Sequence, residues 1–208
     1  MIASISMRVA LLALAVSLFA WPAAGQSQDI NVLAHAAAED LLTRARVEEH
    51  NGHTLRAESL YLRALEVDRS LVDAWLGAAR LLDARGRRDE ALRLLREVPR
   101  YALRAAEERV AVAQALHAAG ESDAALNLLR EEVSPPTLRA RVTLCASLGR
   151  FPEALAAARR WSEFSELSDS DRREATVTAR ALGRLVAEAD AVRYAPGAPT
   201  LRRLLQPR

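Results

Sequence analysis

Glycine recurs along this chain at a nearly constant interval, and this regularity constrains the fold more than any other feature. Five of its 8 glycines, spaced by 34, 34, 29 and 34 residues, are Gly52, Gly86, Gly120, Gly149 and Gly183. An alanine lies five residues after each of the first four, at Ala57, Ala91, Ala125 and Ala154. A fixed period of this length indicates a repeat protein, in which each structural unit packs on its neighbours.

Each repeat is predicted to be a pair of antiparallel helices. Alanine and leucine supply most of the apolar content, and only 4% of the residues are aromatic, a composition that favours helix over strand. Apolar residues spaced three apart, as at Leu92, Leu95 and Val98, point the same way. We expect the glycine to end the first helix of each pair, because the residue after a last turn often adopts a left-handed conformation.

One stretch carries a more specific pattern. Its residues are Trp75, Ala78, Ala79, Leu82, Gly86, Ala91 and Leu95, and their spacing resembles the signature of the tetratricopeptide repeat (TPR) family. The resemblance implies an all-α fold, a right-handed solenoid of four to five antiparallel helix hairpins. It places a TPR-like domain at residues 26–195, with repeats at about 38–71, 72–105, 106–134, 135–168 and a degenerate 169–195. The last of these is either a true repeat or a cap. Residues 196–208 form a basic tail.

The amino terminus resembles a secretory signal. Arg8 precedes an uncharged, mostly apolar run from Val9 to Trp21, and small residues lead up to Gly25. We expect a signal peptide at residues 1–25 and a protein exported to the periplasm or cell envelope. An uncleaved helix that anchors the chain in a membrane is the alternative.

Charge and motifs exclude several classes of function. The net charge is +2, with 29 cationic and 27 acidic residues that alternate along the chain, whereas nucleic-acid binders usually concentrate cations on one face. No phosphate loop, nucleophile elbow or zinc-protease motif is present. We therefore predict no catalytic residue, no cofactor and no nucleic-acid partner.

Two weaker signals, a pair of histidines and a single cysteine, could indicate sites of chemistry. His50 and His53, beside Glu48, could hold a metal loosely, but they straddle a predicted turn without further ligands, so no metal site is predicted. The single cysteine, Cys145, aligns with Leu82 and Leu116 and is expected to be a small buried apolar residue rather than a reactive thiol.

The expected function is binding of a protein or peptide, because in TPR-like arrays the first helices of successive hairpins line a concave groove. We transfer the groove-lining positions of such arrays to this sequence by the repeat register, which gives one set of residues for each of the first three repeats. The predicted partner-binding residues are Glu39, Leu42, Arg46, Glu49, Asp73, Leu76, Arg80, Asp83, Val110, Gln114 and His117, with Glu107 completing the third set. Their spacings of three, four and three residues place each set on one stripe of a helix. Leu42, Leu76 and Val110 would be apolar anchors, and Arg46 and Arg80 charged selectors. Alternatively, the acids and arginines simply neutralise one another. A membrane-tethered structural role in an envelope assembly is the alternative function.

Overall fold

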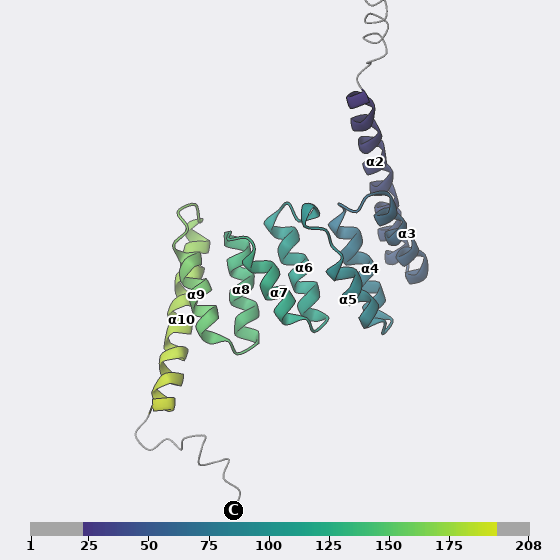
Figure 1. Ribbon diagram of the computed structural model, residues 1–208. Coiled ribbons are helices and arrows are strands. Elements are labelled where there is room, and N and C mark those ends of the chain that lie inside the picture. The colour runs from purple at the N-terminus through teal and green to yellow at the C-terminus, as the bar shows by residue number, and fades with distance from the viewer. Residues whose placement is uncertain (1–22, 195–208) are drawn as a thin grey trace, which may run out of the picture. The chain divides into compact units, whose positions relative to one another are not determined.

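The computed structural model describes residues 23–194, and within this range the regular elements are all helices, with no strand (Figure 1). By internal contacts the chain divides into two compact units, Met1–Ala74 and Trp75–Arg208. The elements are α2 (Ala23–His50), α3 (Thr54–Val67), α4 (Val72–Ala84), α5 (Arg88–Arg96), the 3₁₀ helix η1 (Arg100–Ala102), α6 (Ala106–Ala118), α7 (Ser122–Arg130), α8 (Pro135–Ser147), α9 (Phe151–Ser162) and α10 (Asp169–Tyr194). The predicted all-α, TPR-like hairpin architecture is confirmed.

The glycines end helices as expected. Gly52, Gly86, Gly120 and Gly149 have φ values of 80°, 76°, 97° and 70°, in the left-handed region. At each, the amide of the following residue donates to a carbonyl five residues back, as in the 2.9 Å bond from Arg87 to Leu82. This arrangement satisfies carbonyls that the end of a helix leaves without a partner.

The helix pairs approach closely because the facing positions are small. The alanines five residues after the glycines are at most 1% exposed, as are Ala45 and Ala113 on the first helices of their pairs. Larger side chains fill the space beside them, and Tyr61, Leu95 and Leu129 are at most 4% exposed. The repeat register therefore predicted the buried positions correctly.

The shorter spacing before Gly149 arises in a connection and not in a helix. α5 and α7 each contain 9 residues, and α6 and α8 each contain 13. The segment between α5 and α6 has nine residues (97–105), whereas that between α7 and α8 has four (131–134), which accounts for the five missing residues. A proline at the first position of α8 suits this tight entry, because its missing N–H is not needed there.

The predicted fifth repeat is not a hairpin. Residues Asp169–Tyr194 form one continuous helix, α10, which packs on α9. Gly183 lies inside this helix and does not have a positive φ. Of the two alternatives for this segment, a single helix is compatible with a cap but not with a true repeat, which would be a helix pair.

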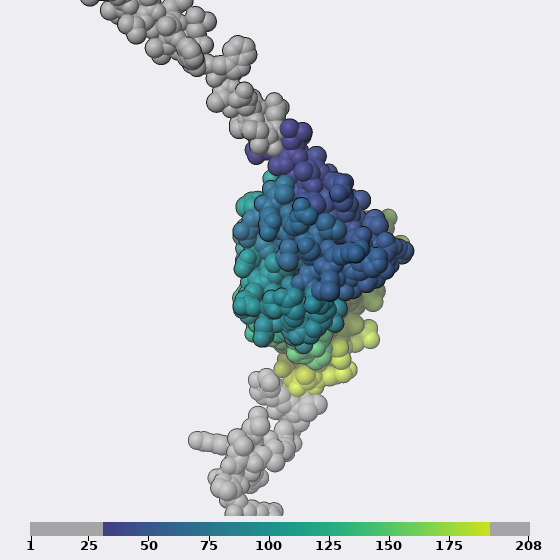
Figure 2. All heavy atoms as spheres, turned by 90° about the vertical axis from the view of Figure 1, so that its right-hand side faces the viewer, coloured from purple at the N-terminus to yellow at the C-terminus, as the bar shows by residue number. Residues whose placement is uncertain are grey.

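The first unit consists of the hairpin α2–α3, in which α2 extends well beyond its partner helix (Figures 1 and 2). Val32 and Leu33, in the extension, are 68% and 70% exposed. His35 marks the end of the paired part, where its Nδ1 lies 2.6 Å from Asp68 Oδ2. Burial raises the pKa of the Asp68 carboxyl, but hydrogen bonds with His35 and Ser70 outweigh it and leave that pKa below its ordinary value.

Two predictions lie largely outside the described residues. The signal peptide at residues 1–25 overlaps them only in its last three residues, and the basic tail at 196–208 does not overlap them. Between residues 23 and 194, no helix combines the length and apolarity needed to cross a membrane.

The two kinds of glycine give a matched test of the helix ends. We expect Gly86→Ala to destabilise the protein by about 1 kcal/mol, because alanine is strained at positive φ. Gly183→Ala should stabilise it by about 0.5–1 kcal/mol, because alanine favours a helix interior. The added methyl has room, since its nearest neighbour is Leu155 Cδ1 at 3.9 Å. Urea unfolding of both variants measures the difference, and equal shifts would contradict the assignment of these two glycines.

Candidate functional site

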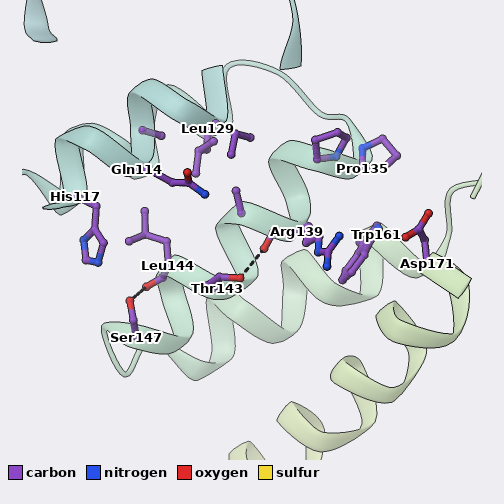
Figure 3. A pocket seen from close by; sticks show the side chains of 14 residues that line it. Gln114, His117, Leu129, Pro135, Arg139, Thr143, Leu144, Ser147, Trp161 and Asp171 are labelled. Carbon is purple, nitrogen blue, oxygen red and sulfur yellow. Dashed lines mark hydrogen bonds between the residues drawn. The ribbon is translucent and has the colours of Figure 1, made fainter. Parts of the chain in front are cut away.

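A groove lies between the first helices of two successive hairpins in the second unit. It has a volume of about 490 Å³ and is lined by α6 and α8, with contributions from α7, α9 and the start of α10 (Figure 3). We call it the α6–α8 groove. Its lining residues are Val110, Ala113, Gln114, His117, Leu129, Pro135, Pro136, Arg139, Ala140, Thr143, Leu144, Ser147, Trp161 and Asp171.

The floor of the groove is apolar and its edges are polar. Leu129 and Leu144 are 1% and 7% exposed and so belong to the core beneath it. Gln114 and Thr143 are exposed on the facing helices α6 and α8. An apolar floor with few polar groups around it is the usual composition of a ligand site.

The start of α8 is fixed by a buried hydroxyl. Thr137 is fully buried, and its Oγ1 accepts from the Ser134 amide and shares its one proton between the carbonyl oxygens of Glu132 and Ser134, each at 3.0 Å. These bonds tie the short α7–α8 connection to the first turn of α8. They therefore position Arg139, two residues further along the same helix.

One end of the groove is charged. The Arg139 guanidinium lies 5.8 Å from the ring centroid of Trp161, and its Nη2 lies 3.0 Å from Oε1 of Glu174 on α10. Asp171 at the same end accepts a 2.6 Å hydrogen bond from Ser168 Oγ. At the other end His117 Nδ1 and Ser122 Oγ are 2.8 Å apart.

Of the predicted partner-binding residues in the second unit, those on α6 line this groove. Val110, Gln114 and His117 do so, whereas Leu76, Arg80 and Asp83 on α4 do not. Leu76 is partly buried, and Arg80 and Asp83 are exposed. Binding by the α4 residues stays a prediction.

Polar residues predicted to bind a partner in the first unit contact other residues of the same unit. Arg46 pairs with Asp73, and Glu49 accepts a 2.8 Å hydrogen bond from the Tyr61 hydroxyl. Glu39, exposed, lies 3.4 Å from His35 Nε2. The Arg46–Asp73 pair matches the alternative in which acids and arginines neutralise one another.

Leu42, the predicted apolar anchor on α2, is buried. It is only 7% exposed and shares a buried stripe of α2 with Ala38 and Ala45, spaced four and three residues away. Residues at these spacings lie on one helix face, and here that face is the one turned to the core. The role of Leu42 as an apolar anchor stays a prediction, and its low exposure counts against it.

The α8 side of the groove was missed, although the repeat contains the signal for it. Val110 and Gln114 precede Gly120 by ten and six residues, and Arg139 and Thr143 precede Gly149 by the same numbers. Extending the register to the fourth hairpin would have identified both. Trp161 and Glu174 lie on other helices, so that register could not have identified them.

Of the two weak signals of chemistry, the histidines lie at the α2–α3 turn and the cysteine lies in the core. His53 Nδ1 lies 2.8 Å from Glu48 Oε2 across the α2–α3 turn, and His50 is exposed. Residues 23–194 contain no group of three or more potential metal ligands. Cys145 is 1% exposed, and burial raises the pKa of its thiol, so it lies in the core as expected.

Comparisons with known proteins give structural similarities but no match in sequence. No family model and no curated protein matches the sequence. Among solved structures, the chain is similar to YrrB, described as a TPR protein with an unusual peptide-binding site. The identity is 19% and the TM-score 0.47, and the match covers 71% of this chain and 76% of that one. The assignment of the fold rests on the helix hairpins themselves.

Proposed function

We propose that this protein is an interaction scaffold that binds a peptide segment of a protein partner in the α6–α8 groove. The observation that carries the proposal is the groove itself, an open cavity of about 490 Å³ with an apolar floor and polar residues on two facing helices. Binding, rather than catalysis, fits a site whose side chains are mainly apolar or hydrogen-bonded to neighbours.

An extended or helical peptide matches the shape of this site. The two facing helices each present a polar residue at the rim, Gln114 and Thr143, which could bond to the peptide backbone. Val110, Pro136 and Ala140, which are all partly exposed, offer apolar surface between them for one or two side chains. Such contacts favour a short segment rather than a flat protein surface.

Selection of short displayed random peptides on the full chain, followed by affinity measurement with the selected peptides, tests this. We expect Thr143→Arg to weaken binding at least about tenfold, because the new side chain fills the groove with a charge over an apolar floor. Ala156→Arg on α9 is the matched control, since Ala156 is exposed and outside the groove.

Each result has a clear meaning. Loss of binding in Thr143→Arg alone, with circular dichroism unchanged in both variants, supports the groove. Equal affinity of both variants would move the binding surface elsewhere, and failure to select any peptide would reject peptide binding by this chain.

The location in the periplasm or cell envelope forms part of the proposal and is supported by the sequence of residues 1–25. Fractionation of the native producing cells tests it. A mature chain beginning near Gln26 in a membrane-free fraction supports export with cleavage. A full-length chain in the membrane fraction would instead support the tethered structural role.

A further inference from the structure

Arg139 is held in position at the end of the α6–α8 groove. Its guanidinium lies 5.8 Å from the centroid of the Trp161 ring, and Trp161 is only 2% exposed, so the ring is fixed by packing. An arginine over an aromatic face is attracted to the ring while the edges of its guanidinium keep donors available. Arg139 is therefore oriented before any ligand arrives.

A carboxylate of the chain already occupies one of these donors. Glu174 extends from α10, and its Oε1 lies 3.0 Å from Arg139 Nη2. The two side chains are 57% and 44% exposed. A pair this accessible to water adds little net stability, so another carboxylate can replace Glu174 at small cost.

The rest of the groove makes this position selective for an acid. Arg139 is the one arginine among the lining residues, which contain no lysine, and Asp171 beside it is engaged with Ser168. A peptide carboxylate that enters an apolar groove loses water and needs a cationic partner. The charge of the site thus complements a peptide with an acidic side chain placed next to apolar ones.

We propose that the peptide ligand of this groove carries an aspartate or glutamate side chain that binds Arg139, and that Glu174 is an internal competitor displaced on binding. This inference rests on the proposed function, because it specifies the ligand of the same site. Glu174 belongs to the closing helix α10, so the last helix of the array would set the affinity of the groove.

The test uses amidated synthetic peptides from the selection, each made with its acidic residue and with the corresponding amide residue. Amidation removes the terminal carboxylate, so the side chain is the acid under test. We expect Arg139→Gln to weaken the acidic peptide about tenfold or more and to leave the amide version nearly unchanged. Glu174→Gln should tighten the acidic peptide about two- to fivefold.

Arg130→Gln is the matched control. Arg130 is an exposed arginine on α7 that pairs with Glu153 at 2.8 Å and does not line the groove. Its loss removes the same charge and should leave both peptides unaffected. An equal effect of Arg130→Gln and Arg139→Gln would reduce the result to long-range charge and overturn the proposal.

The remaining outcomes separate this inference from the proposed function. Some peptides could bind, lose affinity in Thr143→Arg and show no preference for the acidic residue. This result would support the groove as the binding site but overturn the role of Arg139. Peptides weakened rather than tightened by Glu174→Gln would overturn the role of Glu174 as competitor. Failure to select any groove-dependent peptide would reject both the function and the inference.

Discussion

Replacing Trp161 with alanine should lower the free energy of unfolding by about 3–5 kcal/mol, the range found when a large buried aromatic side chain is removed. Trp161 is 2% exposed on α9, which packs on both α8 and α10. Removal leaves a cavity where three helices meet, and the neighbouring alanines Ala157 and Ala158 are too small to fill it.

Urea unfolding followed by far-UV circular dichroism measures this effect. Tyr101→Ala is the control, because Tyr101 is an aromatic residue 59% exposed and its loss should cost no more than about 0.5 kcal/mol. In a repeat array the damage can remain local, so hydrogen exchange should show α8–α10 opening first. Equal stability of the two variants would mean that Trp161 is not packed as described.

Replacing Thr137 with valine should cost about 1–3 kcal/mol, although the two side chains have nearly the same shape. The hydroxyl of Thr137 serves the carbonyls of Glu132 and Ser134 and the amide of Ser134, and the side chain is fully buried. Valine removes the partner of the Ser134 amide and of the Glu132 carbonyl at a part-buried site, whereas the Ser134 carbonyl keeps its bond from the Leu138 amide.

Two variants control this experiment. Thr137→Ser retains the hydroxyl and should recover most of the loss. Thr143→Val makes the same chemical change on the same helix, but Thr143 is exposed, so the cost should stay within about 0.5 kcal/mol. If Thr137→Val were as stable as Thr143→Val, the buried hydroxyl would have no part in starting α8.

Most of the fold could be predicted because its signals are local. A left-handed residue is needed wherever one helix ends and the chain turns sharply, and Gly52, Gly86, Gly120 and Gly149 supply it at regular intervals. The same register identified the buried alanines, since close approach of two helices requires small residues at fixed offsets from the turn. These requirements act within one hairpin and so leave a mark in one stretch of sequence.

The register failed where the local pattern was compatible with two arrangements. Gly183 has the same spacing as the other glycines, yet α10 continues through it. One glycine costs a helix only about 1 kcal/mol, which packing on α9 can offset. Leu42 is a similar case. The apolar stripe of α2 predicts that one face of the helix is buried, but it does not predict how wide that face is.

The sequence by itself thus determined the helix pairs, the residues at which most of them end and the buried alanines, because each depends on backbone conformation or on spacing within one repeat. Only the tertiary structure decided how the charged end of the groove is assembled. Arg139, Trp161 and Glu174 come from three different helices, and their contacts depend on how α8, α9 and α10 pack. Such contacts between individual side chains on different helices do not recur with the repeat, since any exposed arginine and any exposed acid would have fitted the same sequence pattern.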